Sequence, residues 1–240
     1  MKKGFCFLIS CLFFHSVIFA NVNLLNDYLE LYYSGEDVDI EEVKGLYEEA
    51  MVNLEANPTE TSIVYYLKSS MLLSTLYSSG KFPEYHLLVE SLKETINQKI
   101  QIEKLTENGL LAYADYLYSE FSWNNNNSEI IIILPNIYRK ILTLNKNNKE
   151  ALLKLALWYI SASSYYTSNW NAFILGQEKN IESLFITDKF NAYILYSMFY
   201  MKNYDVDKGL ENLIKAKGIF PNNPMIFVVE SNYNSGKIGW

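Results

Sequence analysis

The chain has 240 residues, with 27 acidic and 20 basic side chains, a formal net charge of −7 and two cysteines. This negative charge disfavours nucleic acids and anionic membrane surfaces as partners, because both repel acidic proteins. The length suffices for a hydrophobic core without disulfides. Prolines and glycines are few, at five and ten, and alternating strand patterns are almost absent, so we predict an all-α protein.

The N-terminal segment differs in character from the rest of the chain. Lys2 and Lys3 precede the apolar run 5–19, and Ala20 follows it. This pattern is typical of a secretory signal peptide, so we expect cleavage after Ala20 and a periplasmic or secreted protein. Two alternatives are weaker. The run is short for a membrane anchor, which needs about 20 apolar residues, and Cys11 lies too early for acylation as in lipoproteins.

Cleavage at this point would change the chemistry of the mature protein. Both cysteines and His15 leave with the peptide, so that His86 is the one remaining histidine. The formal net charge changes from −7 to −9, because Lys2 and Lys3 leave and no acid does. A mature chain without cysteine has no disulfide, no thiolate nucleophile and no cysteine zinc site.

The first half of the mature chain shows apolar residues at helical spacing, separated by segments that contain Pro and Gly. Helices are predicted over 41–57, 62–77, 84–101 and 110–121, with a further helix that ends at 138–144. The β-branched run Ile130–Ile133 suits a strand by propensity. A lone strand has no neighbour to pair with, so we predict the start of a helix there, with Pro135 in an early turn.

The segment 190–221 has the side-chain pattern of two antiparallel helices that pack closely. One face of the first helix carries three bulky residues and one small residue, Tyr193, Tyr196, Ser197 and Tyr200. After a turn at 202–204, Gly209 lies where the two helices would cross closely. Leu213 and Ala216 follow on the same face, and Pro221 ends the second helix.

This pattern resembles the tetratricopeptide repeat (TPR). A second copy at 149–188 has Leu152, Leu155, Ala156 and Tyr159 in its first helix, and Gly176, Ser183 and Asp188 in the places of Gly209, Ala216 and Pro221. Its turn, around 161–170, is longer by about seven residues than the repeat norm. The resemblance implies a single TPR-like α-solenoid of stacked helix pairs over 21–240. A capping helix at 222–234 would pack Phe227 against the last repeat.

In TPR proteins, fixed positions of the first helices line a groove. The resemblance implies that the partner-binding residues here are Leu153, Leu157, Ile160, Ile194, Met198, Met201 and Lys202. A mostly apolar groove suits an amphipathic helix or an apolar ligand better than an acidic peptide. Alternatively, the long turn or the segment 225–240 folds back and buries this row as core. The long turn is itself a second candidate surface, through Tyr165, Tyr166, Trp170 and Phe173.

Catalytic and metal-binding patterns are weak. His86 and Glu90 lie one helical turn apart, but no third metal ligand is placed by spacing. Asp39 and its acidic neighbours alternate as in a calcium loop without the required glycine, and an acidic helix start explains them more simply. Asp115 and Glu120 could serve glycoside hydrolysis, but only their presence supports it.

These observations predict an exported scaffold for protein association and not an enzyme. We expect another envelope or secreted protein as partner, with no cofactor, no metal ion and no membrane span after cleavage. A periplasmic binding protein for an apolar small molecule, associated with a transporter, is the second alternative. A cell-envelope hydrolase is the third.

Overall fold

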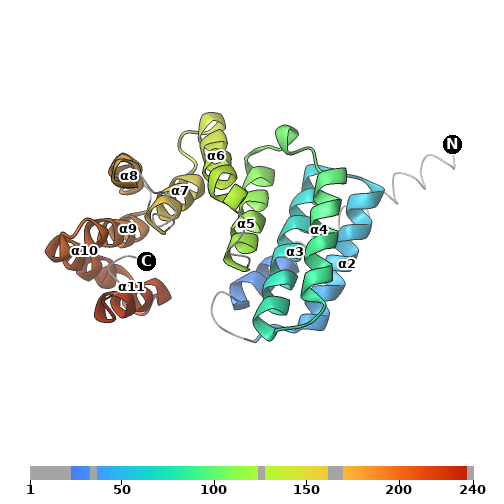
Figure 1. Ribbon diagram of the computed structural model, residues 1–240, viewed down its shortest axis with the longest axis horizontal. Helices are drawn as coiled ribbons and strands as arrows, with labels where there is room; N and C mark the ends of the chain where they lie inside the picture. Colours follow the sequence, from blue (N-terminus) through green and yellow to red (C-terminus); the bar gives the residue numbers. More distant parts are fainter. Residues whose placement is uncertain (1–22, 33–36, 124–127, 162–169, 187, 237–240) are drawn as a thin grey trace. The chain divides into compact units, whose positions relative to one another are not determined.

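A computed structural model describes residues 23–32, 37–123, 128–161, 170–186 and 188–236 (Figure 1). The described residues form helices and no strands, which confirms the all-α prediction. The predicted signal peptide lies outside them. None of the described helices is both long and apolar enough to cross a membrane.

The contacts divide the chain into two compact units, with the boundary between residues 127 and 128. Unit 1 contains helical residues 23–32, α2 (Ile40–Ala56), α3 (Glu60–Gly80), α4 (Tyr85–Lys99), the short 3-10 helix η1 (Ile102–Lys104) and α5 (Glu107–Trp123). Unit 2 contains α6 (Ser128–Leu144), α7 (Lys149–Ser161), α8 (Trp170–Leu184), α9 (Lys189–Lys202), α10 (Val206–Ile219) and α11 (Pro224–Asn234).

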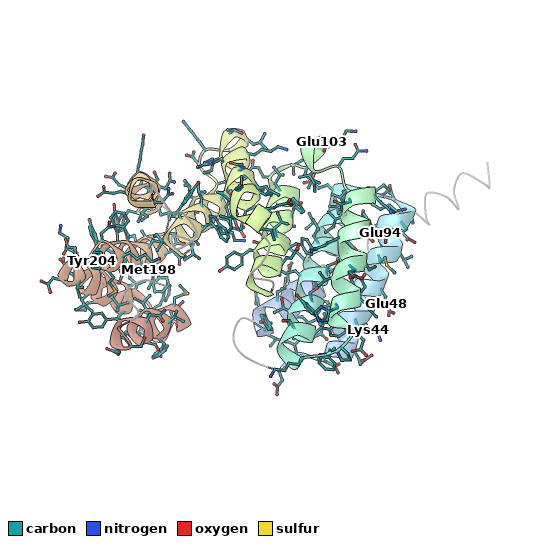
Figure 2. All side chains as sticks on the ribbon, viewed as in Figure 1. Lys44, Glu48, Glu94, Glu103, Met198 and Tyr204 are labelled. Atoms are coloured by element: carbon teal, nitrogen blue, oxygen red, sulfur yellow. The ribbon has the colours of Figure 1, made fainter. Side chains whose placement is uncertain are left out.

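The centre of unit 1 is α3, which contacts α2, α4 and α5. Buried side chains lie all round this helix, among them Tyr65, Tyr66, Leu67 and Leu72, as expected for a helix enclosed by others. The outer faces of its neighbours carry charge, and Figure 2 labels the exposed Glu48 on α2 and Glu94 on α4. The helices predicted over 41–57, 62–77, 84–101 and 110–121 are therefore confirmed within a few residues at their ends.

Polar side chains set where α2 and α5 begin. Asp39 Oδ1 accepts hydrogen bonds from the backbone N–H groups of Glu41 and Glu42, at 2.9 and 3.4 Å. This confirms the prediction that the acidic residues around Asp39 mark the start of a helix. Glu60 of α3 accepts a hydrogen bond from Gly109 N–H at 3.0 Å, so its carboxylate caps the start of α5 from a different helix. Two helices distant in sequence are thus joined.

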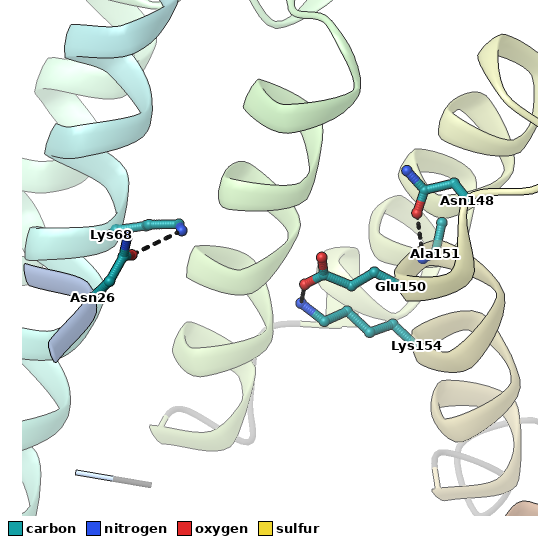
Figure 3. Close-up of polar contacts among 6 residues, drawn as sticks. All are labelled: Asn26, Lys68, Asn148, Glu150, Ala151 and Lys154. Carbon is teal, nitrogen blue, oxygen red and sulfur yellow. Dashed lines mark hydrogen bonds and ion pairs between the residues drawn. The ribbon is translucent and has the colours of Figure 1, made fainter. Parts of the chain in front are cut away.

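Asn26 and Lys68 join the helical residues 23–32 to α3, at 3.4 Å between Oδ1 and Nζ (Figure 3). In unit 2, Asn148 caps α7 through Ala151 N–H at 2.9 Å. Glu150 and Lys154 form an ion pair at 2.6 Å on the first turns of the same helix. The predicted start of this helix near Lys149 is therefore confirmed.

The helix α6 confirms that the β-branched run is helical, but the expected position of Pro135 is wrong. The helix begins at Ser128, so Pro135 lies in its interior and not in an early turn. Ile130, Leu134, Ile137 and Ile141 are buried at helical spacing. Burial of this face outweighs both the strand propensity and the cost of an interior proline.

In unit 2, α9 contacts four helices: α7, α8, α10 and α11. The predicted close crossing at Gly209 is confirmed, since a Cβ built there would lie 2.5 Å from Met201 Cγ and 3.2 Å from the carbonyl oxygen of Ser197. Leu213 and Ala216 are buried beside α9. The helix α10 ends at Ile219, two residues before Pro221, as expected of a helix-ending proline.

The equivalence of Gly176 and Gly209 is wrong, because a Cβ at Gly176 would have no atom within 4 Å. Among residues 176–184 of α8, whose side chains the structure describes, Gln177, Ile181 and Leu184 are buried. These three residues have the same spacing as Gly209, Leu213 and Ala216 in α10. Each lies one residue after the position that the repeat pattern predicts. The second helix of the earlier pair is therefore offset by one position, with Gln177 and not Gly176 in the place of Gly209.

Gly176→Ala is expected to raise the free energy of unfolding by about 0.5–1 kcal/mol. Alanine costs less backbone entropy than glycine inside a helix, and the space around Gly176 is open. Urea unfolding followed by circular dichroism measures the change. A loss of stability would show that Gly176 does lie at a close helix crossing.

The predicted C-terminal helix is confirmed as α11, which Asn223 caps through Met225 N–H at 3.0 Å and which has Pro224 in its first turn. The predicted contact of Phe227 is wrong. Ile226 and Val229 are fully buried against the core around α9, whereas Phe227 is exposed. Ile226 and Val229 are three residues apart and lie on the same face of the helix, whereas Phe227 points to a different side.

Candidate functional site

The residues predicted to line the groove lie together in the core around α9. Leu153 and Leu157 are partly buried against that core. The other five are buried, each at most 4 % exposed: Ile160, Ile194, Met198, Met201 and Lys202. Figure 2 labels Met198 on α9. As described, these five side chains could contact a partner only if neighbouring elements moved apart.

Ile226 and Val229 of α11 belong to the same core as Ile194 and Met198. This agrees with the alternative in which part of the segment 225–240 buries the apolar row. The repeat register therefore predicts correctly which side chains gather, but it does not predict that they are covered.

Lys202 is the one charged member of the predicted groove, and its ammonium is buried. Its Nζ donates a hydrogen bond to the carbonyl oxygen of Ile160, near the end of α7. A cation there interacts favourably with the carbonyl groups that end a helix. Burial lowers the pKa of Lys202 to about 8, from an ordinary value of 10.5.

Because the pKa of Lys202 is lowered, we expect the free energy of unfolding to depend on pH in the alkaline range. Below about pH 8 the ammonium is charged in both states, and the folded protein bears the full cost of burying it. Between about 8 and 10.5 the unfolded chain holds a proton that the folded protein lacks, so stability rises with pH. We expect the stability of the wild type relative to Lys202→Met to rise by about 2 kcal/mol from pH 7 to 9.5.

Urea unfolding of both proteins at the two pH values measures this difference. The matched control is Lys146→Met, which changes an exposed lysine. An equal result for the two variants would contradict the burial of a charged Lys202.

The second candidate surface falls largely outside the described residues. Tyr165 and Tyr166 lie beyond them, and Trp170 and Phe173 are placed only as backbone positions of α8. The proposed contact role of these four residues stays a prediction.

The weak catalytic and metal patterns gain no support from the geometry. His86 and Glu90 are exposed on α4. Glu120 Oε1 pairs with Lys93 Nζ at 2.7 Å, so its carboxylate has a cation as partner. Among the described residues, no group of three or more His, Cys, Asp or Glu side chains is placed to hold a metal ion.

The surface that the sequence pattern missed is an exposed apolar edge at the end of unit 2. Its members are Ile214 and Phe220, which are 70 % and 55 % exposed, and Phe227 and Val228, which are 56 % and 44 % exposed. We call these four residues the α10–α11 edge. The two helices lie next to each other in Figure 1 and contact each other.

An ion pair shows how this edge is assembled. Lys217 of α10 and Glu230 of α11 pair at 2.8 Å. Phe220 is three residues after Lys217, and Phe227 is three residues before Glu230. Because a short connection makes α10 and α11 antiparallel neighbours, both rings lie on the same side of the ion pair. The ring of Phe220 also packs edge-on against Phe190, with centroids 5.1 Å apart.

The apolar residues of the sequence would indicate this edge only if it were already known which face of α11 is buried. Phe227 and Val228 follow the buried Ile226 directly, and a run of apolar residues does not show which members are covered.

No family model, curated protein or solved structure matches the chain.

Proposed function

We propose that the protein is an exported interaction scaffold, with a TPR-like stack of antiparallel helix pairs in unit 2, that binds another envelope or secreted protein. Each helix from α7 to α11 contacts the next one along the chain. The alternate helices α7 and α9, and α9 and α11, also contact each other. Contacts between neighbouring pairs of this kind are expected in stacked helical repeats, and the close crossing at Gly209 agrees with the TPR resemblance.

The observation that carries the proposal is the exposure of the α10–α11 edge. Large exposed apolar patches are uncommon on soluble monomers and often mark interaction surfaces. The two phenylalanine rings could provide the buried centre of an interface, and Lys217 and Glu230 could contribute to its polar rim. We propose the apolar face of an amphipathic helix as the partner segment, since such a face fits an edge between two helices.

Co-purification with a double variant tests this surface. Ile214→Glu with Phe227→Glu places two charges on the edge and changes only side chains that are more than half exposed, so the fold should persist. The matched control is Val52→Glu with Leu87→Glu, which changes two equally exposed apolar residues of unit 1.

Both doubly substituted proteins are first checked by a circular dichroism melt, and bound proteins are then recovered from the native envelope after crosslinking in cells. We expect a partner with the wild type and the control, and its loss with the edge variant. Retention of the same partner by a folded edge variant would overturn the proposed surface. Recovery of no partner by the wild type would overturn the scaffold proposal itself.

A further inference from the structure

The interior of unit 1 contains a group of buried hydroxyls that the proposed function does not use. Tyr66 and Ser70 of α3 are fully buried, and Tyr116 of α5 is 2 % exposed. None of the three hydroxyls has a hydrogen-bond partner of good geometry among the described residues. The interior of the unit is thus polar at the point where its central helix meets α5.

Several observations place these hydroxyls together. The rings of Tyr47 and Tyr66 have centroids 5.9 Å apart. Burial, followed by the nearby Tyr47, raises the pKa of Tyr66, whose hydroxyl also lies near Thr95 and Ser70.

Tyr116 lies between this group and a buried carboxylate. Burial raises its pKa most, and the neighbouring Glu120, Tyr66 and Tyr113 raise it further. Tyr66 and Ser70 are one helical turn apart on α3, and α3 contacts α5, where Tyr116 is influenced by the charge of Tyr66. The cluster continues through Glu120 to Lys93, whose side chain is partly exposed.

An unpaired hydroxyl in a protein interior is costly, because it gives up hydrogen bonds to water and receives nothing in return. Each hydroxyl can donate one hydrogen bond and accept others. A water molecule bound among three such groups can satisfy all of them, and buried waters typically make about three hydrogen bonds. A larger ligand is disfavoured because the surrounding side chains are almost completely enclosed.

We propose that Tyr66, Ser70 and Tyr116 form an internal hydration site, in which bound water joins the hydroxyls of α3 to that of α5. Through this water, the buried hydroxyls of α3 and α5 form one hydrogen-bonded network. The sign of a mutational effect tests this role. If the hydroxyls bind water, their removal breaks hydrogen bonds, whereas if they are unpaired, their removal relieves a cost.

Tyr66→Phe and Tyr116→Phe remove one hydroxyl each from the full chain without changing the ring. We expect each variant to lower Tm by about 2–4 °C. The double variant should lose less than the sum of the two, because both hydroxyls bind the same water.

Tyr65→Phe is the matched control. Its hydroxyl is also buried and unpaired among the described residues, but it lies near Glu49 and outside this cluster. Tyr65→Phe combined with Tyr66→Phe should therefore be additive. Higher Tm values for Tyr66→Phe and Tyr116→Phe, or additivity between them, would overturn the proposal.

A crystal structure of the wild type, at a resolution that shows ordered water, gives the direct answer. We expect a water within hydrogen-bonding distance of at least two of the three hydroxyls. Direct hydrogen bonds among these residues with no water between them, or density for a larger molecule, would overturn the assignment.

Discussion

Gly209→Leu is expected to lower the free energy of unfolding by about 3 kcal/mol, the upper part of the range for overpacked cores. A Cβ at this position would lie 2.5 Å from Met201 Cγ, 3.2 Å from the carbonyl oxygen of Ser197 and 3.3 Å from the backbone nitrogen of Met201. The methionine side chain could rotate away. The two backbone atoms belong to α9 and could move only if α9 and α10 separated.

The matched control is Gly218→Leu in the same helix. A Cβ at Gly218 meets no atom within 4 Å, so this variant should keep its stability or gain slightly from the better helix propensity of leucine. Urea unfolding followed by circular dichroism measures both. Equal stability of the two variants would contradict the close crossing of α9 and α10.

Met198→Glu is expected to cost more than 4 kcal/mol and to unfold unit 2 at neutral pH. Met198 is 1 % exposed among the apolar residues around α9. A glutamate there must bury an unpaired charge or take up a proton, and either way the core loses well-packed apolar surface. We therefore expect this predicted groove side chain to be required for folding, whatever its role in binding.

Tyr204→Glu is the control for this variant, because Tyr204, which Figure 2 labels, is 83 % exposed. Its stability should remain within about 0.5 kcal/mol of the wild type, as is usual for surface substitutions. The helical signal in circular dichroism should fall for Met198→Glu and remain for Tyr204→Glu. A folded Met198→Glu protein would show that this position can open to solvent.

Much of the fold could be predicted because helical periodicity is local. The ends of α2, α4 and α9 were predicted within a few residues, and Gly209 was identified because close helix crossings need small side chains. The same rule, that close crossings need small side chains, led to the wrong repeat register for α8. Gly176 matches Gly209 because both residues are small, but the face of α8 that packs inward contains Gln177, Ile181 and Leu184.

The candidate site was harder to predict because exposure depends on distant segments. Periodicity brings Ile194 and Met198 to one face of α9, but only the folded chain shows Ile226 and Val229 in the same core. The exposure of Phe227 follows from that packing, and so does the α10–α11 edge. In unit 1 the many tyrosines were visible in the sequence. Their enclosure round α3 was not, because it depends on three separate helices.

Site-specific photocrosslinking tests most directly the central claim, that the α10–α11 edge is the partner surface. A photoreactive phenylalanine analogue replaces Phe227 in one protein and the exposed Leu87 of unit 1 in another, and both are irradiated in the native envelope. The account predicts a crosslinked partner from position 227 that is absent from position 87, and its loss when Ile214→Glu is added. A partner crosslinked equally from both positions, or only from position 87, would contradict it.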